Sequence, residues 1–143
     1  MSLENEIKEI EPSLLEVAHE VFRQVPYNKL LGMDLAEMRV GFAAVRLKMR
    51  DELRQPHGTL HGGATASVID TAMAFAVVSM LGEGERASTV DLTVHYLRPV
   101  TSGEITCTAR VVRGGRNLLT VSAEVVNAEE KLIATALSTY SKV

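Results

Sequence analysis

The stretch GATASVIDTAMAFAVVSM, residues 63–80, decides the fold. It is apolar nearly all round and contains no Gly or Pro after its first residue, so we expect one long helix from Gly63 to about Met80. A helix with so little polar surface must be surrounded by protein on most of its sides. A membrane-spanning helix is not favoured, because the stretch carries Asp70 and several hydroxyl side chains and is rich in Ala rather than Leu.

After this helix the apolar residues recur at every second position, which is the period of a half-buried β-strand. The three apolar rows are Val90, Leu92, Val94 and Tyr96; Ile105, Cys107, Ala109 and Val111; and Leu119, Val121, Ala123 and Val125. A last strand is expected over residues 131–141. The segments between the strands are short and carry Pro, Gly or Asn, so we expect hairpin-like connections and a meander of four antiparallel strands.

The residues before the long helix divide into three parts. Apolar residues at helical spacing follow Pro12 and predict an amphipathic helix that ends before Pro26. Residues 33–49 alternate in the two-residue period and are broken by Gly41, which predicts a β-hairpin. Residues 50–62 have no period and form a loop that leads into the long helix.

This order of elements predicts an α+β fold. An antiparallel sheet with one face open to water and the other wrapped on the apolar helix satisfies it directly. We expect a single domain over residues 1–143, with an N-terminal helical segment over 1–28 and the core over 29–143. A small unit of this kind leaves a sheet edge or a helix face unpaired, so we also expect a homodimer or homotetramer.

Composition and charge exclude several classes of protein. The chain has 143 residues, of which 46% are hydrophobic and 23% charged, as in one ordinary globular domain. Its net charge of −3 arises within residues 1–11, and the neutral remainder argues against broad nucleic-acid binding. The acidic N-terminus does not resemble a signal peptide, and one cysteine cannot form an internal disulfide, so the cytoplasm is the expected compartment.

Two features of the long helix point to chemistry. Gly62 and Gly63 leave backbone N–H groups uncovered at its N-terminus, where the helix dipole favours a negative oxygen, so they are candidates for an oxyanion hole. The alternative is that two glycines merely permit a tight turn into the helix. Asp70 interrupts the apolar sequence, and a buried carboxylate can act as a nucleophile or general base, or simply bind a neighbouring strand's backbone. Gly63 and Asp70 share a helix face about 10 Å apart, so one reaction centre would need two chains.

Two weaker patterns remain. His57 and His61 stand four residues apart, but they lie in a loop with no third ligand, so no metal is expected and His61 is expected to hold the loop backbone. Residues 98–116 carry a local net charge of +3 and include a Gly-Gly turn, which suits a phosphate-rich ligand. The alternative for this positive cluster is a solvated strand edge that its charges protect from pairing.

Three runs of sequence together resemble a known family. The run HGGATASVIDTA at residues 61–72 is preceded by Gln55 and followed by STVDL at 88–92 and YLRP at 96–99. This pattern resembles the hotdog-fold acyl-CoA thioesterases of the PaaI-like and THEM-type group, from about residue 30 to the C-terminus. The resemblance implies a long helix wrapped by a curled antiparallel sheet, dimers that share a continuous sheet and tetramers formed from dimers. It implies acyl-CoA as the substrate, with aryl or medium-chain acyl groups, and no metal or cofactor.

The resemblance also implies catalytic roles. His61 and Gly62 match the loop in which a backbone N–H polarises the thioester carbonyl. Asp70 matches the carboxylate that acts as nucleophile or as base for water, and it would come from the facing subunit. Ser88 matches a hydroxyl that orients the water or the carboxylate. Gln55 stands where many relatives have Asn, which keeps the amide but lengthens its reach by one methylene.

Further residues are expected to bind substrate on the same ground. Gly63 and Thr89 adjoin the catalytic positions in the matching runs. In the family, coenzyme A lies along the surface near the turn that matches Arg113, Gly115 and Arg116. The positive cluster is therefore expected to bind coenzyme A.

Two other functions fit the same fold. One is a non-catalytic acyl-CoA-binding or sensing protein, which the retention of Asp70 with His61-Gly62-Gly63 disfavours. The other is a dehydratase or hydratase acting on acyl thioesters, whose arrangement of a His with an acidic residue is not found in this sequence.

Overall fold

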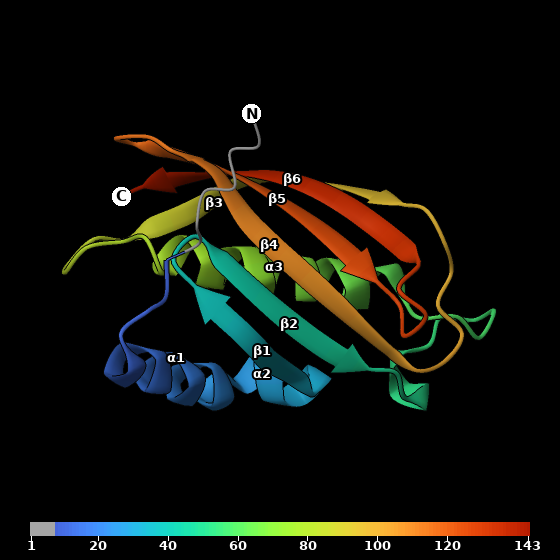
Figure 1. Cartoon of the computed structure of the whole chain (residues 1–143). Helices are drawn as coiled ribbons and strands as arrows, with labels where there is room; N and C mark the ends of the chain where they lie inside the picture. The colour runs from blue at the N-terminus through green and yellow to red at the C-terminus, as the bar shows by residue number, and fades with distance from the viewer. Residues whose placement is uncertain (1–7) are drawn as a thin grey trace.

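A single long helix runs through the middle of the molecule, and the sheet curls around it (Figure 1). The computed structural model describes residues 8–143. The helix is α3, Gly62–Val78, and its buried side chains include Val68, Ile69 and Met73. It begins one residue earlier and ends two residues earlier than the sequence predicts, and it forms the centre of the core as expected.

Six antiparallel strands form the sheet, in the order β1-β2-β4-β5-β6-β3. Their bounds are β1 Met33–Arg39, β2 Phe42–Lys48, β3 Ala87–Tyr96, β4 Glu104–Gly114, β5 Leu118–Val126 and β6 Leu132–Lys142. Alternate side chains of β4 and β5 and of most of β6 are buried and face α3, whereas β2 buries the four successive residues 42–45 as well as Leu47. The predicted strands are therefore confirmed, and their two-residue period is the pattern of a sheet with one face on a core.

The prediction of a four-strand meander is wrong for the first of the four strands. Only β4, β5 and β6 follow one another as neighbours, whereas β3 pairs with β6 and β4 pairs with β2. The connection from β3 to β4 is therefore not a hairpin. Within it the Val100 carbonyl accepts from the Leu60 N–H (2.8 Å), so the segment is tied to the loop before α3 rather than folded back on β3.

The N-terminal part is helical for longer than the sequence predicts. Helix α1, Pro12–Gln24, ends before Pro26 as expected, but a second short helix, α2, Pro26–Leu31, follows at once. Pro lacks the N–H that would continue α1, and its fixed φ suits the first turn of the next helix. Gly32, at φ +75°, ends α2. Glu4 and Glu6 of the acidic N-terminus lie outside the described residues.

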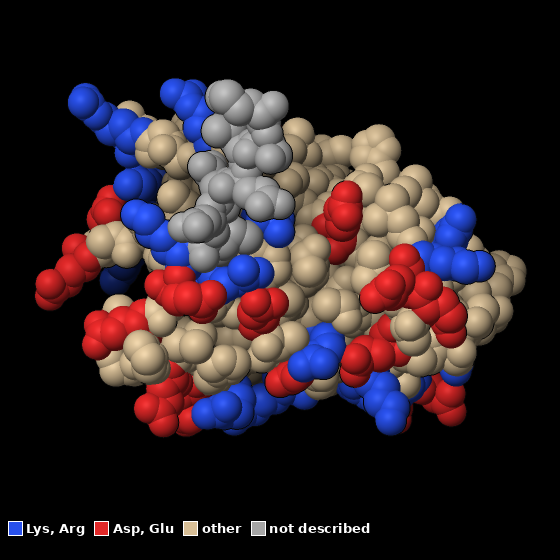
Figure 2. All heavy atoms as spheres, in the orientation of Figure 1, with Lys and Arg blue, Asp and Glu red and all other residues tan. Residues whose placement is uncertain are grey.

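Two surfaces of the chain are open where the sequence predicts burial. One face of α3 is exposed along Gly63, Asp70 and Val78. Strand β3 forms an edge of the sheet, and Val90 and Tyr96 of its apolar row are 61% and 55% exposed. On the face shown in Figure 2, acidic and basic side chains are interspersed over the lower part, and basic side chains gather at the upper left.

Candidate functional site

The N-terminus of α3 presents one free backbone donor. His61 is the N-cap residue, and its Nδ1 accepts a hydrogen bond from the Gly63 N–H (2.8 Å). The His61 N–H itself donates to the Leu53 carbonyl (2.8 Å). Among residues 8–143, the Gly62 N–H has no hydrogen-bond partner. Of the two predicted oxyanion donors, Gly62 is therefore available, whereas Gly63 is already bonded to the cap.

The loop before α3 is held by its own hydrogen bonds. The Gln55 side-chain amide donates to the Thr59 hydroxyl, and its carbonyl oxygen accepts from the His57 N–H. The Gln55 N–H also donates to the Thr59 carbonyl (2.8 Å). Gln55 thus orders the loop that leads to His61, and both ends of its amide are bonded within that loop.

Asp70 lies on the open face of α3, two turns beyond Gly62. In the single chain its side chain is exposed, yet the protein around it excludes enough water to raise the pKa of the carboxyl group. No hydrogen bond or ion pair of the Asp70 carboxylate is found within residues 8–143, so its binding to a strand backbone, the alternative to a chemical role, is not observed.

A buried tyrosine that the sequence analysis does not single out lies beside Asp70. Tyr140 of β6 is 3% exposed, and its hydroxyl approaches the Asp70 main-chain carbonyl at 3.5 Å. Burial, together with the Asp70 charge, raises the pKa of Tyr140. The signal was present in the sequence, because Tyr140 continues the buried row Ala134, Ala136 and Ser138 with a polar tip.

The structure places Thr89, but not Ser88, beside Tyr140. Thr89 pairs with Tyr140 across the β3–β6 ladder, and Ala87 packs against the core. Because successive side chains of a strand point to opposite faces, Ser88 projects to the face away from Tyr140. Within one chain the Ser88 side chain therefore does not lie beside Asp70.

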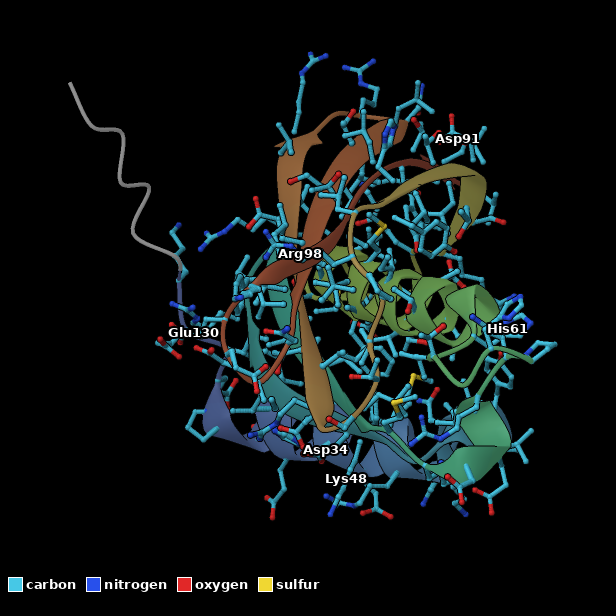
Figure 3. All side chains as sticks on the ribbon, turned by 90° about the vertical axis from the view of Figure 1, so that its right-hand side faces the viewer. Asp34, Lys48, His61, Asp91, Arg98 and Glu130 are labelled. Atoms are coloured by element: carbon cyan, nitrogen blue, oxygen red, sulfur yellow. The ribbon has the colours of Figure 1, made fainter. Side chains whose placement is uncertain are left out.

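Gly62 and Asp70 cannot serve one substrate carbonyl from the same chain. They are eight residues apart on a straight helix, which is about 12 Å along the axis. In Figure 3, His61 lies at the end of α3 that faces the viewer, and the rest of the helix recedes behind it. The two groups could meet only if a second copy placed its α3 alongside.

The predicted positive cluster is divided between three places. Arg98 lies near the start of α3, and Arg110 stacks on Phe42 with its guanidinium carbon 5.0 Å from the ring centre. Arg113 and Arg116 lie at the β4–β5 connection, beside the C-terminal end of α3, where Met80 approaches Gly114. The Gly115 N–H donates to the Leu118 carbonyl (2.8 Å) within the turn, so it is not a free donor in this structure.

A cavity of about 290 Å³ opens beside the free Gly62 donor. Its walls include Gly62, Tyr96, Arg98 and Val100. The Tyr96 hydroxyl donates to the Gly62 carbonyl (2.9 Å) and so fixes the position of this residue. Arg98 is the charged residue of the lining, and it belongs to the same chain as the oxyanion donor.

Two further observations concern metals and membranes. Within residues 8–143, no three His, Cys, Asp or Glu side chains lie close enough to hold a metal ion, and His57 and His61 have no third partner. No helix of this part of the chain is both long and apolar enough to cross a bilayer.

Comparisons with known proteins agree with this arrangement. The thioesterase superfamily model matches residues 57–134, which include the Gly62 donor and Asp70. The chain is 33% identical to the acyl-coenzyme A thioesterase PaaI of Escherichia coli strain K12, over 82% of each protein. It is 31% identical to the medium/long-chain acyl-CoA thioesterase YigI of the same strain, over 88% of this chain and 92% of YigI.

Solved structures show the same architecture. The structure of E. coli PaaI, from the phenylacetic acid degradation operon, superposes with a TM-score of 0.83 at 30% identity and covers 90% of this chain and 92% of that one. The helix wrapped by a curled six-stranded sheet is the hotdog fold of these proteins. The chain belongs to the thioesterase superfamily.

Proposed function

We propose that the protein hydrolyses acyl-CoA thioesters to the free acid and coenzyme A. The observation that carries the proposal is the unpaired Gly62 N–H at the N-terminus of α3, together with a partly desolvated carboxylate on the open face of that helix. The family match and the names of the relatives PaaI and YigI support coenzyme A as the thiol of the substrate.

The proposed mechanism assigns charge stabilisation to Gly62. The thioester carbonyl oxygen accepts a hydrogen bond from the Gly62 N–H, and the helix dipole stabilises the negative charge that develops on it. Asp70 of the facing subunit either attacks the carbonyl carbon or removes a proton from the attacking water. The carbon–sulfur bond then breaks, coenzyme A leaves as the thiolate, and water supplies the oxygen of the acid and the proton of the thiol.

The proposed reaction centre requires a homodimer. The long edge of β3 is unpaired within the described chain, and two such edges can join antiparallel into one continuous sheet. This pairing runs the two α3 helices in opposite directions, so that the N-terminus of one approaches the middle of the other. A dimer, alone or within a tetramer, then holds two equivalent sites. None of these steps uses a metal or cofactor.

Free-thiol release tests the function. The unmodified protein is incubated with acetyl-CoA, straight-chain acyl-CoAs of medium and long length, and phenylacetyl-CoA, and thiol is measured with a colorimetric reagent. We expect turnover of at least one acyl-CoA. Saturable binding of these compounds without thiol release would contradict the proposal and favour the non-catalytic acyl-CoA-binding alternative.

Arg113 and Arg116 are expected to bind the nucleotide end of coenzyme A. Their turn lies far from Gly62 of the same chain, but in the proposed antiparallel dimer it approaches the partner's site. Replacing either residue by Ala should raise KM for an acyl-CoA more than KM for the matching acyl-pantetheine, which lacks the nucleotide phosphates.

Lys48→Ala serves as the control for this pair, because it removes a cation on β2 away from the β4–β5 turn. Equal changes of KM for both substrates in the Arg113→Ala and Arg116→Ala variants would contradict the role in phosphate binding.

A further inference from the structure

A hollow of about 400 Å³ lies between the second half of α3 and the start of β3. In Figure 1 it corresponds to the left-hand end, where the last turns of α3 approach the first residues of β3. Ala74, Val77 and Val78 of α3 form one wall, Ala87 of β3 and Tyr140 of β6 another. Its volume falls in the range of small-molecule binding pockets.

The hollow begins one helical turn beyond Asp70, and Tyr140 of its lining lies next to that residue. Ala74 follows Asp70 by one helical turn on the same face of α3. Tyr140 lines the hollow, and its hydroxyl approaches the Asp70 carbonyl at 3.5 Å. A substrate whose carbonyl carbon lies at Asp70 can therefore extend its acyl group along α3 into this space.

The lining of the hollow suits an aliphatic group. The α3 wall is Ala and Val, and Leu81 extends it past the end of the helix. Tyr140 is the single ring of the lining. An aryl group gains most from stacked or edge-to-face ring pairs, and one ring that is only 3% exposed supplies little of this.

The far end of the hollow is lined by exposed charged side chains. Glu85 forms an ion pair with Lys142 (2.8 Å) and accepts a hydrogen bond from the Gly82 N–H (2.7 Å). Glu85 and Gly82 both belong to the lining, and Arg86 stands next to them. A chain that reached this end would have to lie against charged groups or displace them, which is unfavourable for methylene groups. The helical part of the apolar section, from Ala74 to Val78, spans roughly 6 Å at helical rise, and Leu81 extends it further.

A second apolar hollow, of about 290 Å³, lies on the other side of Val78, between α1 and α3. Phe22 of α1 packs edge-on against Phe75 with ring centres 5.0 Å apart, and Phe75 lies between Asp70 and Val78 in the α3 sequence. This contact holds α1 against α3 between Asp70 and the second hollow. Tyr140, which lies next to Asp70, lines only the first of the two hollows, so the hollow beside Tyr140 is the better continuation of the site.

We propose that the hollow formed by Ala74, Val78, Leu81, Ala87 and Tyr140 receives a saturated acyl chain of medium length, and that the charged side chains at its far end limit the chain length that the enzyme accepts. This inference rests on the proposed thioesterase function. It adds to that function the class of acyl group and the residues that select it.

The test measures kcat/KM for saturated acyl-CoAs of increasing length in the unmodified protein and in Ala74→Leu. Leu at position 74 fills the part of the hollow next to Asp70. We expect kcat/KM for the best medium-chain substrate to fall by about 10–200-fold, the range that a misfit of about one methylene produces, while that for acetyl-CoA changes little. The preferred chain length should become shorter.

Two further variants test whether a change in chain-length preference arises from the proposed hollow. Ala87→Ile narrows the same hollow from β3, where a β-branched residue is well tolerated, and should also shorten the preferred chain. Val17→Phe narrows only the second hollow, beside α1, and should leave the chain-length profile unchanged. An unchanged profile in both Ala74→Leu and Ala87→Ile, or a shift caused by Val17→Phe instead, would overturn the proposed acyl pocket while leaving the thioesterase function in place. Absence of thiol release from every acyl-CoA by the unmodified protein would overturn the function, and the acyl pocket with it.

Discussion

Replacing Asp70 by Asn is expected to abolish nearly all hydrolysis of acyl-CoA while the protein stays folded. Asn has almost the same shape but can neither attack the thioester nor take a proton from water. The loss of a general base alone costs about 10²–10⁴-fold in rate, and the loss of a nucleophile costs more. We therefore expect kcat to fall by at least about 10²-fold, measured by thiol release on the best substrate of the panel.

The pH dependence of the unmodified enzyme should follow the same group. Asp70 must be ionised to act, so kcat/KM should fall as the pH drops through the pKa of its carboxyl group. Partial burial raises this pKa, so the acid limb should lie at a higher pH than that of an ordinary carboxylate. The limb should be absent from the residual activity of Asp70→Asn.

The stability of Asp70→Asn has a predictable sign. A carboxyl group whose pKa is higher in the folded than in the unfolded protein destabilises the fold when both states are ionised, that is, above the folded pKa. This penalty disappears as the pH falls below the unfolded pKa. Asn carries no charge, so at neutral pH the urea midpoint of the variant should equal or exceed that of the unmodified protein.

Asp34→Asn is the matched control, because Asp34 is an exposed carboxylate whose only ion pair within the described chain is a 3.6 Å contact with Arg46. It should retain full activity. Substantial turnover by a folded Asp70→Asn variant would contradict the catalytic role of Asp70.

Replacing Gly62 by Pro is expected to remove the oxyanion donor without disturbing α3. Gly62 is the first residue of the helix, where Pro is well tolerated because its missing N–H has no helical partner. His61 lies at φ −60° and ψ 131°, the extended conformation that a residue before Pro requires. Because the single lost group is the N–H proposed to hold the carbonyl oxygen, kcat should fall by about 10²–10³-fold.

Gly62→Ala is the matched control for this variant. Its Cβ would lie 3.4 Å from the Tyr96 ring, an ordinary contact that the Pro variant shares, but it keeps the N–H. We expect Gly62→Ala to retain most of the activity and both variants to unfold at similar urea concentrations. Equal and large losses of activity in the two variants would place the defect in the Tyr96 contact and contradict the role of the N–H.

Local patterns were sufficient to predict the elements of the fold. The α3 sequence has no polar face, so burial at the centre of a core follows from its composition alone. The apolar rows of β4, β5 and β6 alternate cleanly because one face packs on α3 and the other faces water. Pro26 ends α1 as predicted, but α2 was missed because a proline that ends one helix can also begin the next.

Contacts between distant segments could not be read from local patterns. The order of strands was wrong at β3 because a two-residue period specifies which face of a strand is buried and does not specify its neighbours. The basic residues of the positive cluster, 98–116, are close together in the sequence. Strand β4 separates them in space, with Arg98 near the start of α3 and Arg113 and Arg116 near its C-terminal end. The Tyr140 hydroxyl lies close to the Asp70 main chain only because β6 pairs with β3 and packs against α3.

The sequence by itself determined that this chain forms an α+β fold around one helix, that Gly62 and Asp70 belong to that helix, and that they are too far apart to act together within one chain. These conclusions depend on periodicity and helical rise, which are local quantities. The tertiary structure decided that, within the described chain, Gly62 rather than Gly63 has the free N–H, that Thr89 rather than Ser88 pairs with Tyr140, and that an apolar hollow lies one helical turn beyond Asp70. These depend on hydrogen bonds and packing between segments up to seventy residues apart, which no local pattern specifies.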